Sequence, residues 1–212
     1  MKLAETLIAH VYAQFGRPRG FWGPMVGWIM AARSSNRTRN IWAVSLLDVQ
    51  RRDRILEIGF GPGIAIQEIC RIASEGYVCG LDHSARMLQQ ATRRNAAAIR
   101  EGRVDLRLGS VERLPAFEVP FDKILAVNSF MFWDHPDKSL EELRHLLRGG
   151  GRMAVVHQPR GPGVTDATAV ANGEEITAKL ARAGFSDVRT HMLGLKPAVV
   201  CAIGINRPEE HV

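Results

Sequence analysis

The sequence of 212 residues predicts an α/β protein with a doubly wound sheet of seven strands, mostly parallel with one antiparallel strand, and helices on both faces. Three observations predict this fold. A short apolar run at 55–58 leads into three glycines at alternate positions and then into apolar residues at helical spacing. Beyond residue 54, strand-like and helix-like segments alternate, as they do in parallel sheets. Two late strand-like segments with a short link predict a terminal hairpin, which supplies the antiparallel strand.

The segment before this alternating pattern has a different composition. Apolar residues at helical spacing over 1–15 predict an amphipathic helix, and an aromatic, Met-rich stretch follows at 21–30. Residues 1–54 hold nine Lys and Arg against three Asp and Glu, so the whole net charge of +6 lies there. We predict that 1–45 form an N-terminal helical lid or substrate segment and that 46–212 form the main domain.

The elements of the main domain follow from apolar periodicity and from turn signals. Ser84 is a good N-cap for the helix after the second strand. The glycines at 149–151 predict the end of a later helix, and Gly184 predicts the end of the last one. The expected strands are 55–58, 77–81, 104–108, 121–127, 153–157, 188–193 and 198–205, and the expected helices lie at about 40–47, 66–73, 84–100, 137–147 and 174–183.

Composition argues against several classes of protein. No apolar run approaches the roughly 18 residues of a membrane span, and the first residues lack the unbroken apolar core of a secretory signal. The three cysteines are far apart and odd in number, so neither a disulfide framework nor a zinc-binding C-x-x-C pair is predicted. We therefore expect a cytoplasmic protein without a metal site, and the sequence leaves a homodimer open.

The turn after the first strand has the composition of a nucleotide-binding loop, because glycines let a ligand approach the backbone closely. A dinucleotide fingerprint would need glycine at position 64, which is Ile64, and no lysine follows to make a P-loop. The motif present, E-x-G-x-G-x-G, resembles motif I of the class I S-adenosylmethionine (SAM)-dependent methyltransferases. A glycine turn in another α/β fold is the alternative. The resemblance implies SAM as cofactor, held at Glu57, Gly59, Phe60, Gly61 and Gly63.

Asp82 ends the second strand, 19 residues beyond Gly63, where a carboxylate can accept hydrogen bonds from both hydroxyls of a ribose. The alternative role is that of a turn residue before a helix. The run from Asp82 to Leu88 is similar to the D-x-S-x-x-M-L run of the same family. That resemblance places His83 beside the adenine and makes Met87 part of the adenine pocket.

Two later segments continue the resemblance. Residues 109–115 resemble the family's G-D-A-E-x-L-P segment at the adenine edge. Here Ser110 replaces the acid, Val111 replaces the small residue, and Glu112 is a substitute acceptor. A segment that starts at Asn128 is similar to the one under the methionine end of the cofactor, where Asn128 would meet the amino group. Both segments could also be ordinary exits from strands.

The acceptor is less well defined by the sequence. His135 and His157 follow strand ends and are the candidate general bases, although either could be an ordinary loop histidine. An aromatic, Met-rich wall suits a small or medium apolar acceptor, a lipid-like one included. Arginines of the N-terminal segment could receive an anionic part of it. The candidate acceptor residues are Trp22, Trp28, Phe130 and Trp133, and the arginines are Arg17, Arg19, Arg33, Arg37 and Arg39.

The sequence therefore predicts a SAM-dependent methyltransferase that acts on an O or N nucleophile of a small or medium, partly apolar molecule. Methylation of phospholipid or RNA and a non-catalytic SAM-binding role are the alternatives. Residues 17–39 could contact a membrane surface, since aromatic and basic residues are mixed there. Nucleic acid is disfavoured because no RNA-binding module and no N-P-P-Y-type run is present.

Overall fold

The computed structural model describes residues 34–207. The expected helix at 1–15 and the candidate residues Trp22 and Trp28 lie outside this range. The described strands are β1 (Arg54–Ile58), β2 (Tyr77–Asp82), β3 (Val104–Leu108), β4 (Phe121–Val127), β5 (Leu147–His157), β6 (Ser186–Leu193) and β7 (Val199–Asn206). The described α-helices are α3 (Ser34–Leu47), α4 (Ile64–Ile72), α5 (Ala85–Arg94), α6 (Ala96–Arg100), α7 (Pro136–His145) and α8 (Asp166–Arg182), and two short 3-10 helices are η1 (Val111–Arg113) and η2 (Phe130–Phe132).

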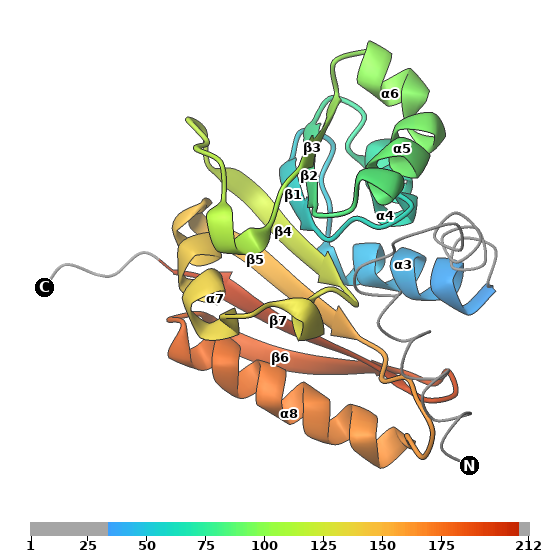
Figure 1. Cartoon of the computed structure of the whole chain (residues 1–212). Helices are drawn as coiled ribbons and strands as arrows, with labels where there is room; N and C mark the ends of the chain where they lie inside the picture. Colours follow the sequence, from blue (N-terminus) through green and yellow to red (C-terminus); the bar gives the residue numbers. More distant parts are fainter. Residues whose placement is uncertain (1–33, 208–212) are drawn as a thin grey trace, which may run out of the picture.

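The seven strands form one sheet in the order β3-β2-β1-β4-β5-β7-β6 (Figure 1). Strands β1 to β5 pair with one another in parallel. Only β7 runs against its two neighbours, β5 and β6. The predicted seven-stranded, mostly parallel sheet with one antiparallel strand is confirmed.

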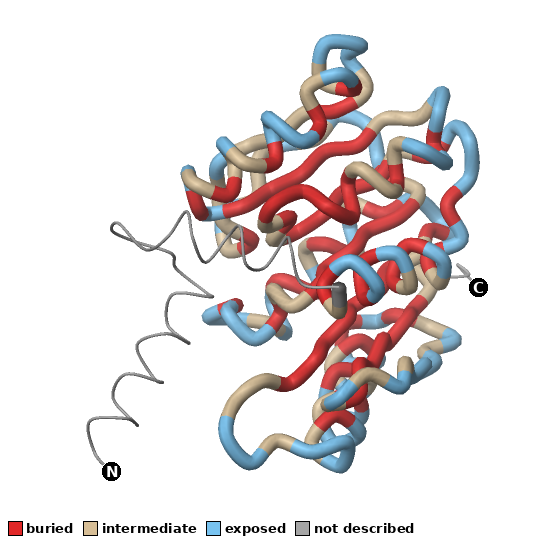
Figure 2. The backbone as a smooth tube through the Cα atoms, turned by 90° about the vertical axis from the view of Figure 1, so that its right-hand side faces the viewer, coloured by how far each residue is buried: buried red, intermediate tan, exposed pale blue. Residues whose placement is uncertain are grey.

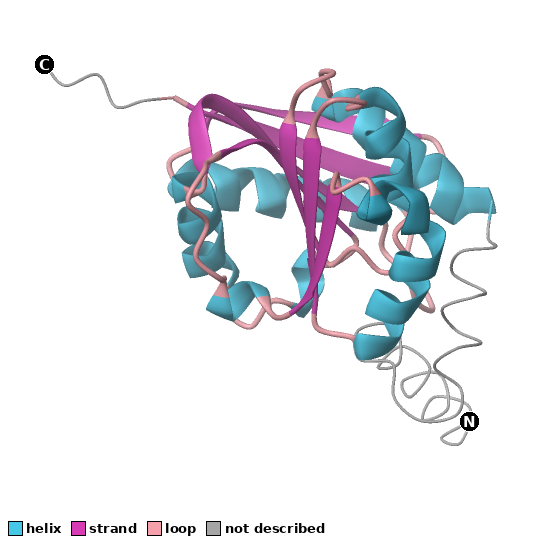
Figure 3. Cartoon of the chain, turned by 90° about the horizontal axis from the view of Figure 1, so that it is seen from above, coloured by secondary structure: helices cyan, strands magenta, loops and turns pink. Residues whose placement is uncertain are grey.

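Helices cover both faces of the sheet, as Figure 3 shows. Successive residues of a strand point to opposite faces, so Ile55 packs in one hydrophobic cluster and Leu56 in the other. The first cluster joins the sheet to α3, α4, α5 and α6, and the second joins it to α7 and α8. The central strands are buried along most of their length (Figure 2). This burial from both faces is the reason that their sequences are nearly continuous apolar runs.

Helix α3 begins six residues earlier than the sequence predicts. It packs on the sheet through Ala43, Val44 and Leu47, all of which are buried. The expected boundary between residues 45 and 46 therefore falls inside one helix that belongs to the core. No helix within 34–207 combines the length and the apolar character needed to cross a bilayer.

The glycines at 149–151 do not end a helix, contrary to the sequence prediction. Helix α7 ends at His145, and β5 already begins at Leu147. In the pairing of β4 with β5, Phe121 lies opposite Leu147 and Lys123 lies opposite Arg152. The four residues 148–151 of β5 therefore lie opposite the single residue Asp122 of β4. The glycines thus form a β-bulge, in which Gly150 has φ of 76°, a backbone angle that favours glycine.

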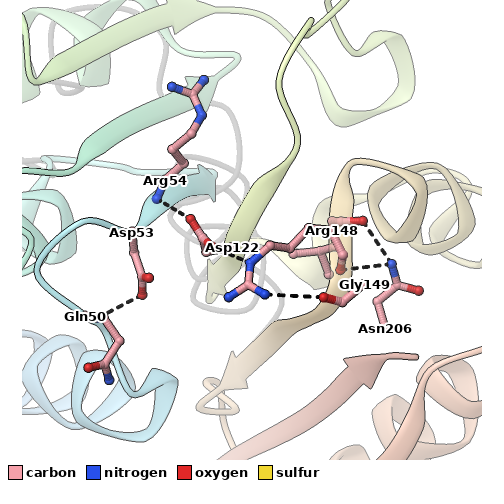
Figure 4. A network of polar contacts seen from close by, with 8 residues as sticks. Gln50, Asp53, Arg54, Asp122, Arg148, Gly149 and Asn206 are labelled. Atoms are coloured by element: carbon pink, nitrogen blue, oxygen red, sulfur yellow. Dashed lines mark hydrogen bonds and ion pairs between the residues drawn. The ribbon is translucent and has the colours of Figure 1, made fainter. Parts of the chain in front are cut away.

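Asp122 holds this bulge in place (Figure 4). Its carboxylate accepts a hydrogen bond of 2.7 Å from the backbone N–H of Arg54 and another from the guanidinium of Arg148. Asn206 donates to the carbonyls of Leu147 and Arg148 at 2.9 and 3.3 Å. The network ties the start of β1, β4 and β5 to the end of β7, at the edge of the sheet opposite the glycine turn.

Two helices differ from their predicted bounds because of tertiary contacts. The helix expected over 84–100 is divided at Asn95, whose buried side chain donates to the carbonyls of Gly63 and Ala91 at 3.2 and 3.0 Å. Helix α8 begins eight residues before the predicted start. Gly173 lies inside it, and a Cβ there would be 3.3 Å from Val200, so the glycine allows α8 to pack closely on β7.

Candidate functional site

The carboxyl ends of β1, β2 and β4 open into a cavity that brings together most of the residues assigned to a cofactor from the sequence. Parallel strands end at the same edge of a sheet, so segments far apart in the chain meet there. Gly63 does not line this cavity and instead precedes α4. The assigned residues that line it are Glu57, Gly59, Phe60, Gly61, Asp82, His83, Met87, Ser110, Val111, Glu112 and Asn128.

Two glycines of the turn line the cavity at positions that no other residue would fill well. Gly59 has φ of 73°, and a Cβ there would lie 2.3 Å from the Cβ of Ser129. The hydroxyl of Ser129 donates to the carbonyl of Ile58 at 2.7 Å, so β1 and the exit of β4 approach closely at this point. Gly61 has φ of 50°, but a Cβ there would meet nothing within 4 Å. The backbone at Gly61 is therefore open to a ligand.

Asp82 connects the glycine turn to the helix that follows β2. Its carboxylate accepts 2.8 Å hydrogen bonds from the backbone N–H groups of Gly61 and Ser84, and the residue is buried. Burial raises the pKa of this carboxyl, while the two hydrogen bonds and the nearby His83 oppose the rise. Each carboxylate oxygen can accept a further hydrogen bond. The group suits a ligand with two adjacent hydroxyls, as in the ribose of SAM.

Glu57 is a buried acid below the glycine turn. It is 1% exposed, and its Oε2 has no hydrogen-bond partner among the described residues. Burial and then the charge of Asp82 raise its pKa well above the ordinary value, although a hydrogen bond from the backbone of Ile66 lowers it. An unpaired buried carboxylate is costly. A cationic ligand group, such as the ammonium of SAM, would satisfy it, so these residues fit the cofactor.

The segment after β3 forms a small polar network. The hydroxyl of Ser110 contacts the carboxylate of Glu112, which also accepts the backbone N–H of Asp134 at 2.8 Å. Burial raises the pKa of Glu112, but the hydrogen bonds from Ser110 and from the Asp134 backbone outweigh it and hold the pKa below the ordinary value. The pair Ser110 and Glu112 thus presents an ionised acceptor at this edge. His135 is exposed, near Glu112, and lines neither this cavity nor the next.

A second cavity of about 370 Å³ adjoins the first. Asn128 and Phe132 line both cavities, and Asn128 has φ of 53°. The oxygen of the Asn128 side chain accepts the backbone N–H of Gln158 at 2.8 Å, which joins the ends of β4 and β5. The remaining lining residues are Met131, His157, Gln158, Pro159, Arg160, Val164, Thr168 and Asn172.

His157 lies at the end of β5 in the wall of the second cavity. It is 5% exposed, and neither ring nitrogen has a hydrogen-bond partner among the described residues. Burial, and then the charges of Arg39 and Arg160, lower the pKa of His157 from 6.5 to about 4. The imidazole is therefore neutral at physiological pH, with one nitrogen able to donate and the other able to accept a hydrogen bond.

Arg39 is a site residue whose position the sequence did not reveal. It lines the first cavity and is 2% exposed. Its guanidinium donates to the side-chain oxygen of Gln158 at 2.7 Å and to that of Asn36. Both of these partners are neutral amides, and burial followed by the charge of Arg160 lowers the pKa of Arg39 to about 9. Asn36, Arg39 and Asn40 share one helix face, which is the only local signal of this cluster in the sequence.

The other residues suggested for the acceptor are divided between core and surface. Trp133 is buried and lines the first cavity. Phe130 lines neither cavity; it packs in the core with its ring centroid 5.0 Å from that of Trp133. Arg37 is exposed and pairs with Glu68 at 3.4 Å. The arginines at positions 17, 19 and 33 lie outside the described residues.

Comparison with known proteins identifies the family. Residues 55–151 match a family model described as a methyltransferase domain. The uncharacterized methyltransferase YdaC of Bacillus subtilis is 33% identical over 179 residues, which cover 84% of this chain and 96% of YdaC. The chain belongs to the class I SAM-dependent methyltransferases. The methyltransferase uses SAM as its cofactor, and the resemblance that was inferred from its motifs is confirmed.

Two further relatives of this methyltransferase are more distant. A SAM-dependent methyltransferase from Aquifex aeolicus has the same fold, with a TM-score of 0.69 at 17% identity over 86% of this chain and 97% of that one. A ubiquinone/menaquinone biosynthesis C-methyltransferase, UbiE, from Geotalea daltonii is 25% identical over 122 residues, which cover 57% of this chain and 52% of UbiE. Within residues 34–207, no group of His, Cys, Asp and Glu is arranged to hold a metal ion.

The close approach of Gly59 to Ser129 predicts a steric penalty that can be separated from backbone strain. Gly102 has a similar φ of 71°, but a Cβ there would meet nothing within 4 Å. We expect Gly59→Ala to lower the free energy of unfolding by about 1–3 kcal/mol more than Gly102→Ala, because only the first overpacks its surroundings. Urea denaturation of both variants measures this difference. Equal losses would mean that Ser129 moves aside freely.

Burial of neutral His157 predicts a loss of stability in acid. The folded pKa of about 4 lies below the ordinary 6.5, so protonation favours the unfolded chain. The stabilisation is complete above about pH 6.5 and is lost as the pH falls towards 4. Between about pH 7 and 4.5, we expect the free energy of unfolding to fall by up to about 3 kcal/mol more in the wild type than in His157→Gln.

Urea denaturation at several pH values tests this expectation, with His191→Gln as the control because His191 is exposed on β6. The free energy of unfolding of the control should fall with pH as steeply as that of the wild type. If the His157 variant loses stability just as steeply, the imidazole is not held neutral by the fold.

Proposed function

We propose that this methyltransferase transfers the methyl group of SAM to an O or N nucleophile on a small or medium, partly apolar molecule that occupies the second cavity. One observation carries this proposal: the second cavity shares Asn128 and Phe132 with the cavity that holds the motif residues. A molecule in it would therefore lie beside the methionine end of the cofactor. Met131, Phe132 and Val164 provide apolar walls. We also propose, as the sequence predicts for 1–45, that the N-terminal segment forms a lid or substrate segment at this region.

The residues around the first cavity have complementary roles in holding SAM. Asp82 would accept the ribose hydroxyls, and Glu57 would neutralise the ammonium. The buried guanidinium of Arg39, whose hydrogen-bond partners among residues 34–207 are the amides of Asn36 and Gln158, would receive the carboxylate at the same end of the cofactor. His83, Met87, Ser110, Val111 and Glu112 would surround the adenine.

The cofactor supplies a methyl group on positively charged sulfur, so the chain's own residues chiefly position the acceptor and exclude water. Asn128 is fixed by its hydrogen bond to the Gln158 backbone and can orient groups on either side. His157 lies in the acceptor wall and is the better placed of the two candidate bases. His135, which lines neither cavity, would act only through a change of loop conformation.

Phospholipid and RNA remain alternatives to a small acceptor, and they make different demands on the surface. A membrane or nucleic acid would contact exposed cations. Of the two described arginines in the stretch 17–39, Arg39 is buried and Arg37 is exposed. Incorporation of labelled methyl groups from SAM distinguishes the acceptors, using apolar small molecules, phospholipid vesicles and bulk RNA as substrates. Transfer to small molecules alone is the expected result, and transfer only to RNA or vesicles would refute the proposal.

Removal of the Asp82 carboxylate should weaken cofactor binding. We expect Asp82→Ala to bind S-adenosylhomocysteine about a hundredfold more weakly, because two charge-assisted hydrogen bonds to the ribose would be lost. Calorimetric titration measures the affinity, and circular dichroism checks that the variant is folded. Asp105→Ala on the neighbouring β3 is the matched control, since Asp105 does not line the cavity. Unchanged affinity in Asp82→Ala would refute the assigned ribose site.

Binding of the cofactor's ammonium near Glu57 should release protons. A neighbouring cation favours the ionised carboxylate and brings its raised pKa back down. We expect S-adenosylhomocysteine binding to be accompanied by proton release at pH values between the ordinary pKa of a glutamic acid and the raised pKa of Glu57. Calorimetry in buffers of different ionisation enthalpy measures the number of protons.

Glu57→Gln should lose this proton release, whereas Glu141→Gln, on an exposed part of α7, should retain it. Proton uptake on binding, or the same release in the Glu57 variant, would exclude contact between Glu57 and the ammonium.

A further inference from the structure

The second cavity carries cationic and neutral polar groups but no acid. None of the described residues that line it is Asp or Glu. Arg160 belongs to its wall, and His157 lies beside it in the same wall. Burial lowers the pKa of both His157 and Arg39, and the positive charge of Arg160 lowers each pKa further. The charged side chain at the end of β5 is therefore a cation, in a cavity whose other polar lining residues are neutral.

The imidazole of His157 adds an unsatisfied polar group to this wall. The side chain is 5% exposed, and both ring nitrogens lack a partner among the described residues. An unsatisfied buried polar group is unfavourable in free energy. A ligand oxygen that accepts the imidazole N–H would recover this free energy. The amide of Asn172 and the hydroxyl of Thr168, on α8, supply further donors to the same cavity.

We propose that the acceptor is an oxygen acid with an apolar body, and that its acidic oxygen binds as an anion in the second cavity against Arg160 and His157. The inference rests on the proposed function and narrows it from O or N nucleophiles to acidic oxygens. A protonated amine would bring a cation beside Arg160 and Arg39 with no lining acid to offset it. Carboxylates and phenol- or enol-type oxygens share the required chemistry.

An acceptor that binds as an anion needs no proton removed during the reaction. The oxygen's lone pair forms the new bond to the methyl carbon, and the electron pair of the broken carbon–sulfur bond stays on sulfur. One negative and one positive charge are consumed together, so charge and atoms balance. His157 would then donate a hydrogen bond that positions the oxygen, which is a role suited to a neutral imidazole.

Calorimetry on the full-length protein saturated with S-adenosylhomocysteine tests the inference with three probes of matched shape: 2-naphthoate, 2-naphthamide and 2-naphthylmethylamine. We expect naphthoate to bind at least about tenfold more tightly than the amide, because a charge-assisted hydrogen bond replaces a neutral one, and the amine to bind most weakly. Equal affinity for the three probes, or preference for the amine, would overturn the inference.

Variants at Arg160 test whether the preference for the anionic probe depends on this residue. Arg160→Gln should weaken naphthoate binding about tenfold and leave naphthamide binding unchanged, whereas Arg160→Lys should keep most of the preference for the anion. Arg93→Gln, on an exposed part of α5, is the matched control and should behave as the wild type. If Arg160→Gln keeps the full preference for naphthoate, the acidic group binds elsewhere and the inference is wrong.

A spectroscopic measurement distinguishes a carboxylic acid acceptor from a phenol-type acceptor. Ionised 4-nitrophenol absorbs visible light, so binding as an anion is seen directly at a pH where the free phenol is mostly protonated. Ionisation on binding that is lost in Arg160→Gln supports a phenol-type acceptor, and naphthoate preference without it supports a carboxylate. If the protein neither prefers naphthoate nor binds 4-nitrophenol as an anion, the inference is wrong. Failure to bind S-adenosylhomocysteine at all would instead count against the proposed function.

Discussion

The buried carboxylate of Asp82 is the contact on which the geometry of the site depends. By accepting the backbone N–H groups of Gly61 and Ser84, it holds the glycine turn of β1 and the start of α5 at one point. The backbone N–H of Gly59 donates to the carbonyl of Leu81 at 2.7 Å, one residue away, so the turn and β2 are held together twice. Two backbone donors stabilise an acid in a buried position and leave it able to bind a ligand.

The two cavities that share Asn128 differ in their charged residues. Two buried acids, Glu57 and Asp82, lie toward the glycine turn, and the pKa of each is raised by burial. Arg39 lines the same cavity as these acids, whereas Arg160 lines the second cavity. Burial, and then the charges of these two arginines, lower the pKa of His157. A buried acid without a counterion is unfavourable in the protein alone. The Oε2 of Glu57, which has no hydrogen-bond partner among the described residues, is explained if the cofactor brings a cation to it.

The fold and the cofactor side of the site were predictable to a large extent. Strands β2, β3 and β4 lie within a residue of their expected bounds, because buried parallel strands have nearly continuous apolar sequences. The errors arose where long-range contacts override local signals. The glycines at 149–151 form a bulge opposite Asp122. Asn95 lies at the break between α5 and α6 and donates a hydrogen bond to the carbonyl of Gly63. Gly173 lies inside a helix because α8 approaches β7 closely.

The sequence by itself determined the strand–turn–helix order, the glycine and acid spacing and hence the family and the cofactor, since these depend on residues close together in the chain. Only the tertiary structure showed which polar groups meet around the acceptor. Arg39 and Gln158 are 119 residues apart and make a buried 2.7 Å hydrogen bond. The lowered pKa of His157 comes from burial and from the charges of Arg39 and Arg160, and no local pattern encodes the proximity of Arg39. Desolvation and charge are properties of the packed fold, so the acceptor chemistry could not be read from spacing alone.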